Sequence, residues 1–336
     1  MITLERDMLN FRFPDVHDSA VCPIHFQRTL RLPDDGRTYP LPAGLGRFPL
    51  RHIDDFPGLP ETFRRRGGVV MPMWQAEAMW VCFAGWGDYP FAVKIAAGKI
   101  NAVSGEDWRE GLHRHPQDYV VVPRQPWLDG FSVKAGRIRQ FVAAPLGKGI
   151  TAEEQLTGAA EHGGLQIVAY PMKKEAYERL FKRELVVAEL YQMPFPCAAP
   201  VASMGLAAGG LMEQEIYQDE YDFDVWDLRA SSRCFVTLLN AEDWHRITGE
   251  APPTEPISAG VYHKHRIPWF DYYAADATAL AGSLRLAGLK TIKDAVKFGL
   301  GKDKWKDEPV AVPPVVQLGP DKRPHRASNE VRQADF

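Results

Sequence analysis

In this chain of 336 residues, two copies of a Pro-Trp-x-Asp motif contain the side chains best suited to catalysis or ligand binding. They are Pro126-Trp127-Leu128-Asp129 and Pro268-Trp269-Phe270-Asp271, and each places a carboxylate next to an indole ring. Glycoside hydrolysis uses two carboxyl groups about 5–10 Å apart, one as acid and one as base or nucleophile. The motifs therefore nominate Asp129 and Asp271 as an acid/base pair, with Trp127 and Trp269 as platforms for a sugar.

A structural role explains the same four residues without any ligand. A Trp ring packs under a turn, and the following Asp accepts hydrogen bonds from the backbone amides of that turn. Short motifs also recur by chance in a chain with 9 Trp and 27 Pro. The two interpretations differ in whether the motifs share one cleft.

Two His-x-His pairs, His113/His115 and His263/His265, raise the hypothesis of a divalent metal site. Residues two apart on a strand share a face, so each pair could present two imidazoles to one ion. The sequence around 261–265 looks like a strand, whereas the first pair lies beside Pro116. Basic neighbours disfavour a cation at both pairs: Arg114, Lys264 and Arg266. Surface histidines are the alternative, and no other cofactor is expected.

The stretch 213–227 carries seven acidic residues, a density that can hold Ca²⁺. Tyr221, Phe223 and Val225 alternate there with polar residues, which is typical of a half-buried strand. We therefore interpret the acids as the solvated face of a strand.

A sequence pattern that occurs twice, at 69–100 and 120–138, predicts strands that would position these residues. Its skeleton is an apolar run ending in Pro, a Trp, Phe-x-Val-Lys, and then Ala-Gly-basic-Ile. Each copy predicts a strand, a loop and a hairpin with its turn at Ala-Gly. The core is thus expected to be β-built and internally duplicated.

Other signals divide the chain into four predicted parts. Residues 1–65 form an N-terminal hairpin or extended segment, and 66–193 form a β-rich domain with a helix at 173–185. A second β-rich part with C-terminal helices covers 194–305, beyond a Pro-rich boundary. Within that boundary, the Gly-rich run 205–210 predicts either a flexible turn or a backbone that lies close to another segment. Residues 306–336 form a Pro-rich extended tail, with a strap near 310–318.

Composition narrows the functional class. A net charge of −3 and the absence of a long basic stripe argue against nucleic acid as a partner. The four cysteines are widely spaced, no signal peptide is visible at the N-terminus, and no apolar run is long enough to span a membrane. A soluble, cytoplasmic protein is expected.

The sequence therefore predicts a mainly β fold of sandwich or barrel type with peripheral α-helices, α+β overall. No complete catalytic motif is present, which favours a non-catalytic protein that binds a protein partner or assembles with itself. The alternative is a hydrolase acting on a glycan or a similar polar substrate through Asp129 and Asp271. A metal-dependent variant would use His263 and His265.

Overall fold

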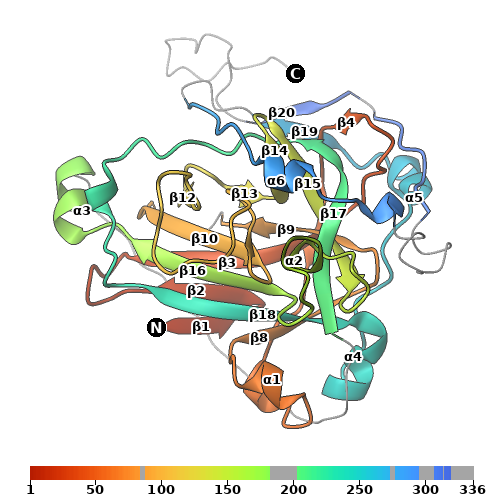
Figure 1. Cartoon of the computed structure of the whole chain (residues 1–336), viewed down its shortest axis with the longest axis horizontal. Coiled ribbons are helices and arrows are strands. Elements are labelled where there is room, and N and C mark those ends of the chain that lie inside the picture. The colour runs from red at the N-terminus through yellow and green to blue at the C-terminus, as the bar shows by residue number, and fades with distance from the viewer. Residues whose placement is uncertain (84–87, 182–202, 273–276, 295–305, 313, 319–336) are drawn as a thin grey trace, which may run out of the picture.

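The computed structural model describes residues 1–83, 88–181, 203–272, 277–294, 306–312 and 314–318. Within these residues the fold is mainly β with short helices around the sheet, as the sequence predicts (Figure 1). Seventeen strands belong to one large sheet, and three short strands form a second sheet. No helix in the described part of the chain has the length and apolarity to cross a membrane.

The large sheet follows a path of antiparallel neighbours. The path runs through β12 (Val120–Val122), β10 (Phe91–Ala97), β16 (Leu165–Pro171), β18 (Ser232–Asn240), β17 (Ser203–Glu213), β15 (Arg137–Pro145), β9 (Ala78–Cys82), β3 (Val21–Thr29), β2 (Met8–Arg12) and β1 (Ile2–Glu5). Shorter strands flank it: β4 (Thr38–Tyr39), β6 (Gly44–Arg47), β7 (Arg51–His52), β8 (Val69–Met73), β11 (Ile100–Asn101), β13 (Trp127–Leu128) and β14 (Gly130–Lys134).

The two ends of this path come together around the main hydrophobic core. Phe13, directly after β2, contacts Phe91 at the start of β10, with ring centroids 5.7 Å apart. Residues of β2, β3, β10 and β16 belong to the same buried cluster. The sheet therefore curls over its own apolar face, which is how a single sheet buries a core without a second layer of equal size.

Strands from different predicted parts of the chain pair with one another. β3, from the first 65 residues, pairs with β9. β8 pairs in parallel with β18, joining residues 69–73 to 236–240. The Pro-rich boundary at 194–200 lies outside the described residues, and the division of the chain into four parts stays a prediction.

Both copies of the repeated pattern end in the expected hairpin. Gly98 turns β10 into β11 and Gly136 turns β14 into β15, each with a left-handed φ. The two hairpins have different outer partners, because β10 pairs with β12 and β16 whereas β15 pairs with β17 and β9. The pattern thus predicts the local turns, while the places of the two copies in the sheet are not equivalent.

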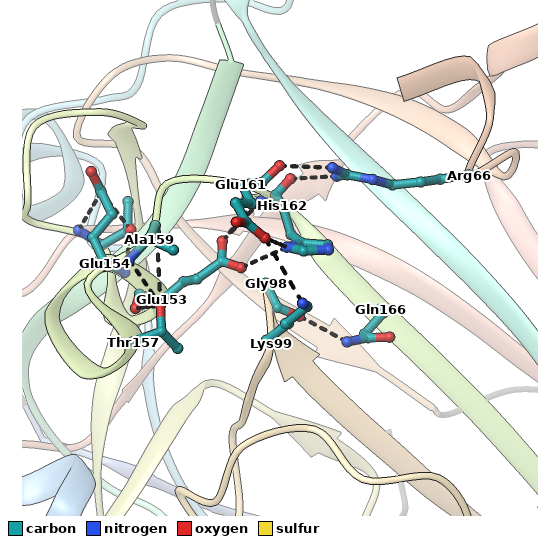
Figure 2. A network of polar contacts seen from close by, with 12 residues as sticks. Arg66, Gly98, Lys99, Glu153, Glu154, Thr157, Ala159, Glu161, His162 and Gln166 are labelled. Atoms are coloured by element: carbon teal, nitrogen blue, oxygen red, sulfur yellow. Dashed lines mark hydrogen bonds and ion pairs between the residues drawn. The ribbon is translucent and has the colours of Figure 1, made fainter. Parts of the chain in front are cut away.

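A network of polar contacts fixes the loops beside the β10–β11 turn (Figure 2). The helix α2 (Ala152–Thr157) begins with a capping box, in which the Thr151 and Glu154 side chains accept from each other's backbone N–H groups. The buried Glu153 carboxylate accepts from the N–H groups of His162 and Gly163 and contacts His162 Nδ1 at 3.1 Å. Arg66 donates to the carbonyls of Glu161 and His162. One carboxylate thus holds the 158–163 loop against the sheet.

The remaining helices lie around the periphery of the sheet (Figure 1). They are α1 (Glu61–Arg64), α3 (Lys174–Leu180), α4 (Ala241–Thr248), α5 (Ala259–Lys264) and α6 (Leu284–Ala287), with 3-10 turns at Ile53–Asp55 and Phe223–Val225. The helix predicted at 173–185 is confirmed over 174–180, and its last four positions lie outside the described residues. The strand predicted at 221–225 is wrong, because a 3-10 turn forms there.

The Gly-rich run 205–210 is part of β17, so the expectation of a flexible turn is wrong. The alternative, a close approach of backbones, is confirmed. A Cβ at Gly209 would lie 2.7 Å from Val142 Cγ2, and one at Gly210 would lie 2.5 Å from the carbonyl oxygen of Pro33. Only glycine lets neighbouring chain segments pack at this distance.

The tail forms a strap, as predicted near 310–318. β20 (Val316–Leu318) pairs in parallel with β19 (Trp269–Tyr272), which pairs in turn with β5 (Leu41–Pro42) to make the second sheet. All three residues of β20 are exposed. The tail beyond 318 lies outside the described residues.

Candidate functional site

Trp127 lies at the centre of a cluster of half-buried aromatic rings. It belongs to β13, which pairs with β9 and so places Trp127 beside Trp80. The Trp80 ring meets the Trp127 ring edge-on at 5.6 Å, and Tyr272, at the end of β19, meets it at 5.0 Å. Three separate segments thus bring their rings to one place, and each ring keeps part of its surface open. This group is called the Trp127 cluster below.

The two Pro-Trp-x-Asp motifs converge only in part. Trp127 of the first motif contacts Tyr272, the residue that follows Asp271 of the second. Asp271 is half-buried on β19 and accepts a hydrogen bond from Gln317 Nε2 at 2.9 Å. The first motif therefore meets the segment that carries Asp271, although the ring contact is made by Tyr272 and consecutive strand residues point to opposite faces.

Trp269 and Asp129 lie below the surface. Trp269 is 1% exposed and packs against Tyr262 and Tyr39 in the core. Asp129 is also 1% exposed, and its carboxyl accepts from Gln214 Nε2 while its backbone N–H donates to Gln214 Oε1 at 3.0 Å. Burial therefore closes most of the Trp269 ring and of the Asp129 carboxyl to solvent.

Burial determines the charge of Asp129. Desolvation raises the pKa of its carboxyl well above the ordinary value, and hydrogen bonds from the Gln214 and Trp127 side chains lower it only in part. No cation is among the groups that shift it. Burial thus favours the protonated form of the Asp129 carboxyl beneath the Trp127 cluster.

Glu215 supplies a second carboxylate beside Asp271. Burial raises the pKa of Glu215, the side chain of Tyr217 lowers it through a hydrogen bond, and the negative charge of Asp271 raises it further. Gln125 ties Glu215 to the cluster, because its Nε2 donates to the carbonyls of both Trp127 and Glu215 at 3.1 Å. Glu215 Oε2 is buried without a hydrogen-bond partner in the described structure. The cluster thus has two acids whose charges interact.

Sequence reasoning missed Trp80, Glu215 and Tyr272. Glu215 belongs to the acidic stretch that we interpreted as a solvated strand face, and nothing in its spacing separates it from the other six acids. Trp80 meets Trp127 through a long-range strand pair, β9 with β13. The one available signal was that Tyr272 directly follows the second motif.

The strand predicted at 261–265 is wrong, and with it the geometry that supported a metal site at His263 and His265. Ser258 caps a helix there by accepting from the N–H of Val261, and α5 covers Ala259–Lys264. Positions two apart on a helix point about 200° away from each other. The two exposed imidazoles therefore do not share a face.

His113 is already engaged by a carboxylate, whereas His115 is exposed. Asp118 accepts from the backbone N–H of His113 at 2.9 Å and contacts its Nδ1 at 2.8 Å. The same carboxylate pairs with the buried Lys94 ammonium at 2.7 Å. This adjacent positive charge opposes a metal ion at His113. In the described parts of the chain no three His, Cys, Asp or Glu side chains come together as metal ligands. A divalent metal stays a hypothesis.

Comparisons with known proteins do not assign this chain to a family. The sequence matches no protein-family model, and searches of curated proteins and of solved structures returned no significant match.

Proposed function

We propose that this chain is a non-catalytic binding protein whose ligand is a glycan or a similarly hydroxyl-rich molecule. The observation that carries the proposal is the Trp127 cluster with Glu215 and Asp271 beside it. A sugar has apolar C–H faces that pack on aromatic rings, and hydroxyl groups that donate to carboxylate oxygens. Aromatic rings held by strand pairing present this surface without a large loss of side-chain entropy on binding.

A glycan-array screen of the purified chain tests this proposal, with Trp127→Phe and Trp127→Ala as the matched pair. We expect the Phe variant to bind the same glycans as the wild type, because it keeps an aromatic face. Loss of a central Trp costs about 2 kcal/mol, so Trp127→Ala should bind about 30-fold more weakly. Equal binding by all three proteins, or binding by none, would refute the proposal.

Hydrolysis of the same class of ligand is the second candidate. The interaction between Glu215 and Asp271 favours it, since a carboxyl group with a raised pKa near a second carboxyl group suits general acid catalysis. Glu215 here takes the place that the sequence suggested for Asp129. If the chain is a hydrolase, Glu215→Gln should keep glycan affinity within about threefold and lower kcat by at least ~100-fold. Absence of turnover by the wild type on glycans that it binds would leave the binding function alone.

A further inference from the structure

A surface pocket of about 530 Å³ lies where the end of α5, the start of β19 and the tail meet. Its volume is within the range of small-molecule sites. It shares no lining residue with the Trp127 cluster and is called the basic pocket below. The residues that line it are His263, Lys264, Arg266, Ile267, Pro268, Trp269 and Pro314.

The titratable side chains that line this pocket are all basic. Lys264 and Arg266 carry positive charges at neutral pH, and His263 adds a third when it is protonated. None of the described residues in the lining is an Asp or a Glu. The pocket therefore favours an anion and opposes a cation.

These basic groups are accessible and lack a counter-charge. His263, Lys264 and Arg266 are exposed, and their side chains make no hydrogen bond or ion pair within the described part of the chain. Arg51 differs, because it pairs with the carboxylates of both Asp7 and Glu250. Neighbouring positive charges without a partner repel each other, so an anion bound among them would relieve this repulsion.

Arg266 occupies a position at which glycine is the usual residue. The helix α5 ends in a Schellman motif, in which the N–H of Arg266 donates to the carbonyl of His263 at 2.9 Å and that of Ile267 donates to the carbonyl of Tyr262 at 3.3 Å. Arg266 is accordingly in the left-handed region, with a φ of 52°. A side chain is unfavourable there. The chain thus carries a guanidinium at a local conformational cost, which points to a use for this side chain.

Hydrogen bonds and ring packing beneath the pocket hold its walls in place. The Tyr262 hydroxyl donates to the carbonyl of Pro268 at 2.7 Å and accepts from the N–H of Ala43 at 2.8 Å. The buried Tyr262 ring meets the buried Trp269 ring at 5.4 Å. Trp269 thus supports the pocket from behind. A surface held in this way needs little further ordering when a ligand binds.

We propose that the basic pocket binds a small organic anion, in which a phosphate or carboxylate group is joined to an apolar body. Lys264 and Arg266 pair with the anionic group. Ile267, Pro268 and Pro314 supply the apolar surface for the rest of the ligand. Two fixed positive charges match the double charge of a phosphate monoester better than the single charge of a carboxylate, so phosphate monoesters bind more tightly. This site is independent of the proposed glycan site.

Isothermal titration of the full chain with phenyl phosphate and benzoate tests the assignment. Benzylamine, benzyl alcohol and inorganic phosphate serve as ligand controls. We expect phenyl phosphate to bind at least ~10-fold more tightly than benzylamine or benzyl alcohol, which lack the negative charge, and more tightly than inorganic phosphate, which lacks the ring. Equal binding by any of these controls, or no binding of phenyl phosphate at millimolar concentration, would overturn the proposal.

Variants at Arg266 separate binding from folding. Arg266→Gly should weaken phenyl phosphate binding at least ~10-fold, while the free energy of unfolding stays at least as high as that of the wild type, because glycine relieves the left-handed strain. Arg266→Lys, which keeps the positive charge, should weaken binding less. If Arg266→Gly binds phenyl phosphate as tightly as the wild type, the assignment is wrong.

Lys148→Gln is the matched control for a change in net charge. Lys148 is exposed and does not line the pocket, so its loss should leave phenyl phosphate binding unchanged. An equal loss of affinity in Lys148→Gln and Arg266→Gly would show attraction by the whole molecule and would overturn the site. Arg266→Gly should keep its glycan affinity, and glycan binding is read separately, so failure of one site does not decide the other.

Discussion

Asp129 occupies a place where a charged carboxylate is unfavourable. It lies where the chain passes from β13 to β14, its side chain is buried, and its partners are the side chains of Gln214 and Trp127. Because burial outweighs these two hydrogen bonds, the folded protein holds the carboxyl in its protonated form at a pH where the unfolded chain has already released the proton.

This difference predicts the sign of a pH effect on stability. The folded state has the higher pKa, so the contribution of Asp129 is fully present below the unfolded pKa, near 4, and is lost as the pH rises toward the folded pKa. The loss is at most about 1.4 kcal/mol per pH unit in that window. Asp129→Asn should abolish this part of the pH dependence, because an amide mimics the neutral acid.

Urea unfolding at a series of pH values measures the effect as the difference between variant and wild type. Asp222→Asn is the control, since Asp222 is exposed. A free energy of unfolding that changes with pH identically in the wild type and in Asp129→Asn would contradict the assignment of a buried neutral acid.

For single residues, the sequence predicted which residue types lie at the site better than it predicted how deeply each side chain is buried. The Pro-Trp-x-Asp motif led to Trp127, which lies in the cluster, and to Asp271 beside it. It could not show that Asp129 and Trp269 point into the core, because short strands such as β13 and β19 bury side chains according to partners far away in the chain. For the same reason Glu215 could not be distinguished among its acidic neighbours.

The two Ala-Gly turns offer a matched comparison of elements. Gly98 and Gly136 both adopt a left-handed φ in a hairpin turn. A Cβ at Gly136 would meet nothing within 4 Å, whereas one at Gly98 would lie 2.4 Å from Glu153 Oε2. Glu153 is the carboxylate that holds the 158–163 loop in Figure 2.

Alanine substitutions at these two glycines should therefore differ in cost. Gly136→Ala should destabilise the fold by about 1–2 kcal/mol through backbone strain alone. Gly98→Ala should cost at least ~2 kcal/mol more, because displacing Glu153 leaves buried N–H groups unsatisfied. Chemical denaturation of both variants measures the difference, and equal losses would show that Glu153 moves aside at little cost.

Local signals predicted elements well where the determinants were close in sequence. The two Ala-Gly hairpins and the helix at 174–180 are of this kind. The strand predicted at 261–265 failed because alternation over five residues does not outweigh a Ser258 cap, which starts a helix. The strand predicted at 221–225 is also wrong, because residues Phe223–Val225 form a 3-10 turn.

For the whole molecule, long-range pairing decides where the candidate sites lie. The parallel pair β8–β18 and the pair β9–β15 join segments that no local pattern links, so the sequence predicted a β fold without its strand order. The Trp127 cluster and the basic pocket both form between segments far apart in the chain. Self-assembly through the tail, whose strand β20 is exposed, stays a hypothesis.

The most direct test of the proposed glycan site is to observe the indole N–H signals of the nine tryptophans by NMR while an oligosaccharide is added. The signals of Trp80 and Trp127 should shift in a saturable way at the same ligand concentration. Those of the buried Trp226, Trp244 and Trp269 should stay in place. Saturable binding that moves other tryptophans and leaves Trp80 and Trp127 unchanged, or the absence of any shift across neutral, acidic and amino oligosaccharides, would contradict the account.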